Sequence, residues 1–119
     1  MMEDAELQAM VEDATLDFTL GDNDAALEKL SRAVGYCPDS FGAWHALAEV
    51  HFSMRNHDEA LAAAEKALSL EPDDVHINTS LSRIWMERGD KTRAEEYGAK
   101  ARMLNWKEEL KDPPSEGQL

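Results

Sequence analysis

The pattern on which the fold depends is clearest in DEALAAAEKALSLEPDD, residues 58–74. Alanines and leucines follow helical spacing there, and the segment ends at a proline and two aspartates. A shift of 34 residues aligns the following sets: Ala26, Ala60 and Ala94; Ala33, Ala67 and Ala101; Phe18, Phe52 and Met86; Gly21-Asp22, Arg55-Asn56 and Gly89-Asp90. A fixed period of this length is typical of a repeat array.

Each period is expected to form two helices joined by a turn. Ser40 is a suitable N-cap for a helix over about residues 41–54. Asp58 is a candidate cap for the next helix, and Pro72 ends it. The turns of the first and third units carry glycine, which suits a left-handed C-cap. Because a helix pair cannot bury its apolar face alone, the units are expected to stack.

The middle unit resembles the tetratricopeptide repeat family, whose pattern is W-x2-L-G-x2-Y, then A-x3-F, then P. The signature places hold Trp44, Leu47, Ala48, His51, Ala60, Ala64, Ala67 and Pro72. His51 for tyrosine, Ala64 for phenylalanine and, in the third unit, Asn78 for tryptophan depart from the pattern. The resemblance implies an all-α fold, a right-handed superhelix of six helices in three helix–turn–helix units. These units are residues 7–40, 41–74 and 75–108, in a single domain over 1–108.

The third unit is expected to end the array. In the first two units an apolar stripe on the second helix suits packing against the next unit, and it consists of Leu27, Val34, Leu61 and Leu68. The matching residues of the third unit are Glu95 and Arg102, and terminal repeats need such a polar face to stay soluble. No separate capping helix is expected. Residues 107–119 include a double proline and few apolar side chains, so they are expected to fray into an acidic tail, placed at 109–119.

The charge of the chain is lopsided. The net charge is −13, and nine acidic residues precede the first basic one, Lys29. Such a surface repels phosphate backbones, so nucleic-acid binding is not expected. A basic partner would be attracted, or the charge serves only solubility. No apolar run reaches the length of a membrane span, the N-terminus lacks the pattern of a secretory signal, and Cys37 is the single cysteine. These features favour the cytoplasm.

No pattern of catalytic or metal-ligating residues stands out. His45, His51 and His57 recur every six residues, a step that turns each by about 240° on a helix, so they do not share a face. His57 also falls in the expected turn. The chain has no HExxH, CxxC, GxSxG or glycine-rich phosphate loop. We therefore predict no enzyme activity, cofactor or metal, and packing as the role of Cys37.

In the tetratricopeptide repeat family, the first helices of successive units line a concave groove that holds a peptide. By register, the resemblance places these residues in the groove: Val11, Thr15, Phe18, His45, Glu49, Phe52, Thr79, Arg83 and Met86. Thr19, Ser53, His76 and Glu87 are expected beside them. The ladder of Phe18, Phe52 and Met86 is either an exposed apolar strip for a partner's side chains or a set of half-buried core residues.

The sequence thus predicts a monomeric interaction module that binds a basic or apolar peptide segment of a partner, as adaptor, co-chaperone or assembly scaffold. One alternative is a self-associating structural protein, which requires exposure of Trp106 and of the ends of the stack. The polar end at Glu95 and Arg102 opposes end-to-end growth of this kind. Another is a secretion chaperone, because small acidic three-repeat members of the family include carriers of type III export substrates.

Overall fold

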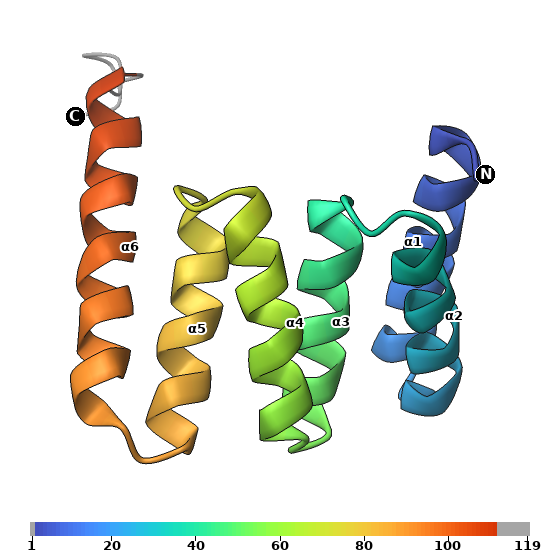
Figure 1. Ribbon diagram of the computed structural model, residues 1–119, viewed down its shortest axis with the longest axis horizontal. Helices are drawn as coiled ribbons and strands as arrows, with labels where there is room; N and C mark the ends of the chain where they lie inside the picture. The colour runs from blue at the N-terminus through green and yellow to red at the C-terminus, as the bar shows by residue number, and fades with distance from the viewer. Residues whose placement is uncertain (1, 112–119) are drawn as a thin grey trace.

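The computed structural model describes residues 2–111, and these form six helices without any strand (Figure 1). The helices are α1 (Asp4–Thr19), α2 (Asn23–Tyr36), α3 (Phe41–Ser53), α4 (His57–Leu70), α5 (Val75–Glu87) and α6 (Lys91–Lys111). They lie side by side as three antiparallel pairs, with α1 and α2 at one end and α6 at the other. The predicted all-α superhelix of three helix pairs is confirmed.

The cap of α3 follows the sequence prediction, whereas the start of α4 does not. Ser40 Oγ accepts a hydrogen bond from the Ala43 N–H at 3.2 Å, as expected of an N-cap. However, α4 begins at His57 and its N-cap is Asn56, so Asp58 lies inside the first turn and His57 is helical. The prediction of Asp58 as the cap, with His57 in the turn, is therefore wrong. An acidic side chain in the first turn still interacts favourably with the helix dipole.

The turn within each unit uses a left-handed residue at the same repeat position. Gly21 has φ of 87° and Gly89 has φ of 84°, which confirms the predicted glycine C-caps. Arg55 takes the equivalent place in the middle unit with φ of 62°. The following N–H then bonds back across the turn, at 2.9 Å from Asn56 to the carbonyl of His51. This closure brings the chain into α4 directly after Asn56, which explains the early helix start.

The core is built largely from alanine. Alanines at the repeated positions are fully or almost fully buried: Ala14, Ala26, Ala33, Ala60, Ala64, Ala67 and Ala94. Small side chains let the paired helices approach closely. The largest fully buried apolar side chains are Ile77, Leu81 and Ile84 in the third unit and Leu30 in the first.

Two first helices are joined to the loop that precedes them by equivalent hydrogen bonds. Trp44 Nε1 donates to the carbonyl of Pro38 at 2.8 Å. Asn78 stands where the third unit lacks the signature tryptophan, and its Nδ2 donates to the carbonyl of Pro72 at 3.0 Å. The two donors and the two prolines are each 34 residues apart. The departure at Asn78 therefore keeps the contact that the tryptophan makes.

The last helix is longer than expected. α6 has 21 residues and continues to Lys111, so the prediction that residues 107–111 fray is wrong. The first two units have a proline at the end of the second helix, but the third has Trp106 there, and tryptophan does not stop a helix. The rest of the predicted tail, residues 112–119, lies outside the described residues. The polar end appears as predicted, because Arg102 Nη2 lies 2.7 Å from Glu95 Oε1 and both side chains are exposed.

Candidate functional site

The candidate groove residues lie on α1, α3 and α5, which are neighbours in the stack. Thr15, Thr79, Arg83 and Met86 are exposed, whereas the other candidates are half-buried: Val11, Phe18, His45, Glu49 and Phe52. The ladder is not uniform. Phe18 and Phe52 pack against the core, while Met86 keeps 53% of its surface exposed.

A polar network links α3 to α5 around Glu49. Ser80 Oγ donates a hydrogen bond to Glu49 Oε1 at 2.5 Å, and His45 Nε2 lies 3.4 Å from the same oxygen. Arg83 Nη2 lies 3.6 Å from Glu49 Oε2. The pKa of the Glu49 carboxyl is lowered, mainly by its hydrogen bond with His45 and against the opposing effect of burial, with smaller contributions from Ser80 and Arg83. Glu49 is therefore a stable carboxylate whose two oxygens are both engaged.

Phe52 is covered on one side by the same arginine. The Arg83 guanidinium lies 4.8 Å from the centre of the Phe52 ring, a cation–π distance. The His57 ring lies 5.9 Å from Phe52. Access to the face of Phe52 therefore depends on the position of the Arg83 side chain.

Two cavities bring part of the candidate set together. The first has a volume of 230 Å³ and is lined by Thr15, Phe18, Leu30, Ala46, Glu49 and Val50. The second has a volume of 200 Å³ and is lined by Phe52, Ser53, Arg55, His57 and Glu87. Phe18 and Phe52 are 34 residues apart, so each cavity has a phenylalanine at the same repeat position.

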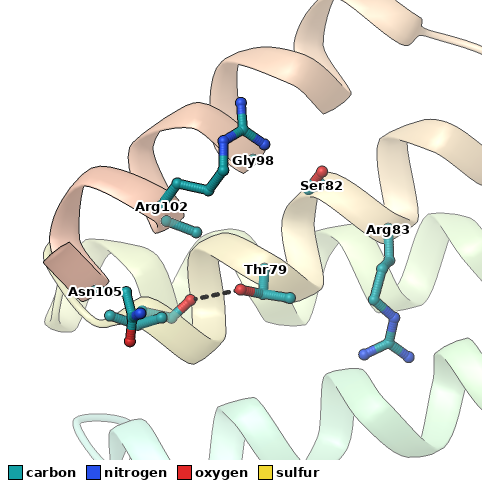
Figure 2. A pocket seen from close by; sticks show the side chains of 8 residues that line it. Thr79, Ser82, Arg83, Gly98, Arg102 and Asn105 are labelled. Carbon is teal, nitrogen blue, oxygen red and sulfur yellow. Dashed lines mark hydrogen bonds between the residues drawn. The ribbon is translucent and has the colours of Figure 1, made fainter. Parts of the chain in front are cut away.

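The remaining candidates lie elsewhere. Val11 lines a separate cavity between the start of α1 and the start of α3. Thr79 and Arg83 line a cavity of 360 Å³ between α5 and α6, which Figure 2 shows from close by. Sequence reasoning missed Ser80 as a partner of Glu49. The only feature of the sequence that could have indicated this contact is the hydroxyl of Ser80, at the repeat position where the second unit has Ala46.

The three histidines have separate surroundings. His45 belongs to the Glu49 network, His51 Nδ1 lies 3.3 Å from Asn56 Nδ2, and His57 faces Phe52. Burial lowers the pKa of His51, and the charge of Glu59 partly offsets this. Within residues 2–111 no group of three or more His, Cys, Asp or Glu side chains is arranged to hold a metal ion. Nor does any helix in that range have the length and apolarity required to cross a bilayer.

Three stacked helix pairs with a 34-residue period, in which the second helix of each pair packs against the first helix of the next, define a helical-repeat protein of the solenoid class. The family model of the tetratricopeptide repeat matches residues 12–68 and 45–104, which together cover most of the chain. The chain belongs to the tetratricopeptide repeat family. No curated protein sequence matches it significantly.

Solved structures with the same arrangement include several of MamA. One MamA crystal structure is 26% identical with a TM-score of 0.81, and the match covers 86% of this chain and 60% of that one. MamA from Desulfovibrio magneticus RS-1 is 19% identical with a TM-score of 0.80, over 85% of this chain and 57% of that one. The CopN–Scc3 complex gives 14% identity and a TM-score of 0.80, and the match covers 87% of this chain and 61% of that one. The last two likenesses concern the fold alone, and the chain spans less than two thirds of each of the three.

Proposed function

We propose that this chain binds a peptide segment of a partner protein along α1, α3 and α5. The observation that carries the proposal is that Phe18 and Phe52, one repeat apart, each lie in the wall of a cavity, although the other residues of the two linings do not correspond by register. An extended or helical peptide can place side chains in successive cavities of a repeat array, because the spacing of the sites is set by the repeat itself. The face is complete in one chain, so the proposed binding unit is a monomer.

The cavities differ in chemistry, and this difference defines the proposed peptide. The first cavity is walled by Phe18, Leu30 and Val50, which suits an apolar side chain. Glu49 also borders it, but its charge is already engaged by Ser80, His45 and Arg83. The second cavity carries the exposed Glu87 and the exposed Arg55, and we propose that Glu87 pairs with a basic side chain of the peptide. The proposed ligand therefore has an apolar anchor followed by a basic residue.

A role as adaptor or assembly scaffold in the cytoplasm is part of the proposal. Interaction modules of this fold act by equilibrium binding, so they require no cofactor. The free, half-buried thiol of Cys37 is compatible with a reducing compartment.

The test uses peptides selected from a displayed random library and measured by calorimetry. Glu87→Lys should weaken the selected peptides at least about tenfold, because a like charge replaces the proposed partner of the basic residue. The matched control is Glu65→Lys on α4, which has the same charge change at an exposed residue outside both cavities. Equal binding by the two variants, or amide shifts on α2, α4 and α6 instead of α1, α3 and α5, would contradict the proposal.

A further inference from the structure

The groove between α5 and α6 is the open end of the stack. Its cavity of 360 Å³ has an apolar part at Val75 and Ala101, and its polar lining includes Thr79, Arg83 and Arg102 (Figure 2). The two helices are closely packed behind it, where Ser82 Oγ donates to the carbonyl of Ala94 at 2.7 Å.

The preceding copy of this groove lies between α3 and α4, and α5 fills it. Thr79 and Arg83 of the open groove correspond to His45 and Glu49 of the filled one, 34 residues earlier. Ser80 of α5 contacts both of these, at 3.3 Å from His45 Nε2 and 2.5 Å from Glu49 Oε1. The open groove is therefore the place that the first helix of a further unit would occupy.

The opposite end of the stack exposes the complementary face. Leu16 of α1 corresponds by register to Val50 of α3 and Ile84 of α5. Leu16 is 55% exposed, whereas Val50 and Ile84 are 2% and 1% exposed because each packs against the unit before it. Ala9 is exposed too, although its counterparts in α3 and α5 are fully buried. Glu12 is exposed beside them. This face is therefore apolar at Leu16 and Ala9 and acidic at Glu12.

We propose that α1 of a second copy docks in the α5–α6 groove, in the register that α5 adopts against α3 and α4. Glu12 of the second copy then takes the place of Ser80, and Arg83 takes the place of Glu49. A carboxylate meets a guanidinium at this point, and Arg83 is accessible because its side chain is 51% exposed. The contact uses different faces of the two copies, so copies add head to tail in an open chain.

The junction between copies is weaker than the junctions within the chain. Leu61 and Leu68 pack against the core at the inner junction, but Glu95 and Arg102 stand at the open end and pair with each other. The net charge of −13 on each copy also opposes association. We therefore expect a monomer in dilute solution and growth in mass between about 10 µM and 1 mM.

The experiment measures mass against concentration by sedimentation equilibrium, at about 0.15 M salt. The wild-type mass should rise without reaching a plateau at the dimer. Glu12→Arg or Arg83→Glu alone should weaken association at least about tenfold, because each places like charges at the junction. The double variant Glu12→Arg with Arg83→Glu should restore it. Glu6→Arg is the control, since it makes the same charge change on the same helix.

Mixing the two single variants separates this proposal from other modes of association. The groove of the Glu12→Arg chain keeps Arg83, and α1 of the Arg83→Glu chain keeps Glu12. An equimolar mixture should therefore associate and grow as the wild type does, because opposite charges meet at both kinds of junction: the retained Glu12 with the retained Arg83, and the two substituted side chains with each other. Circular dichroism checks that each variant is folded.

Three outcomes would overturn the proposal: a wild type that stays monomeric over the whole range, a mass increase that neither single variant reduces, or an equimolar mixture that associates no more than either single variant alone. The proposal does not depend on peptide binding. Glu87→Lys should leave self-association unchanged, and Glu12→Arg should leave peptide affinity unchanged.

Discussion

The first junction joins the first and second units, and the second junction joins the second and third. The two junctions use the same backbone positions and differ in the chemistry of their side chains. At the first junction Thr15 and Ala46 border an apolar cavity, whereas at the second their counterparts Glu49 and Ser80 form a hydrogen bond of 2.5 Å. The ion pair between Arg88 and Asp58 also crosses the second junction. No ion pair within residues 2–111 crosses the first junction. The repeat signature therefore determines how the helices stack, and the positions outside it determine whether a junction is hollow or polar.

The strongest test of this comparison removes apolar volume at the second junction. Ile84→Ala should lower the free energy of unfolding by about 2–5 kcal/mol, because the side chain is 1% exposed and its loss leaves a cavity. Leu16→Ala makes a similar truncation at the same repeat position, where the side chain is 55% exposed, and should change stability by less than about 0.5 kcal/mol. Urea denaturation at low protein concentration measures both. Similar losses for the two variants would show that α1 is buried in solution.

The polar network of the second junction can be weakened without changing its shape. Glu49→Gln keeps the volume of the side chain but removes the charge, which accepts a hydrogen bond from Ser80 and lies within ion-pair distance of His45 and Arg83. We expect a loss of about 1–3 kcal/mol at pH 7, measured by urea denaturation. Thr15→Gln, at the equivalent place of the first junction, serves as the comparison and should have a smaller effect.

Glu49→Gln also tests how the free energy of unfolding depends on pH. The pKa of Glu49 is lowered in the folded protein, so its contribution to stability is present above the unfolded pKa, about 4.3, and is lost as the pH falls through the folded value. The stability difference between wild type and Glu49→Gln should therefore be constant near neutral pH and shrink in acid, below about pH 4.3. A difference that grows as the pH falls would mean that the folded pKa is not lowered.

The hollow junction can be filled. Thr15→Leu should raise stability by about 0.5–1 kcal/mol, because it extends apolar volume into the cavity of 230 Å³ beside Phe18. Thermal unfolding measures the gain. The same change should weaken any peptide whose apolar anchor occupies this cavity, so a variant that is more stable and binds peptide as before would contradict the proposed site.

The smallest effect is expected at the exposed ion pair. Asp58→Ala removes the partner of Arg88, but Asp58 has 83% of its side chain exposed, so the loss should be below about 0.5 kcal/mol. Asp73→Ala, whose side chain is equally exposed and lies 3.7 Å from Lys100, is the control. A loss above about 1 kcal/mol at Asp58 alone would show that the pair does more than a surface contact usually does.

The sequence was sufficient to predict the period, the helix pairs and most of the turns, because those features depend on local residues. Alanines at fixed spacing, Ser40 as a cap and glycines at left-handed positions act within a few residues of themselves. The start of α4 was missed because Arg55 adopts the left-handed conformation without being glycine, so the turn closes at Asn56. The composition of the tail did not predict the length of α6, because the helix continues where Trp106 replaces the proline that ends the second helix of the other units.

The candidate site was harder to predict, since it depends on how one unit is rotated against the next. Register alone placed Glu49 on a first helix, but its contact with Ser80 joins residues 31 apart in different units. The position of Arg83 over Phe52 likewise follows from two long side chains meeting across a junction. Nothing in either residue's own neighbourhood in the sequence indicates that the aromatic face is covered.

The hydrogen bonds from Trp44 to the Pro38 carbonyl and from Asn78 to the Pro72 carbonyl bear on how this molecule can bend. Each holds a connecting loop and the first helix after it as one rigid piece. Bending between units must then take place where helices of neighbouring units touch, by small shifts of packed side chains, and not by rotation of loop dihedral angles. The curvature of the whole array can therefore be altered by one side chain at an interhelical contact, while every loop keeps its conformation.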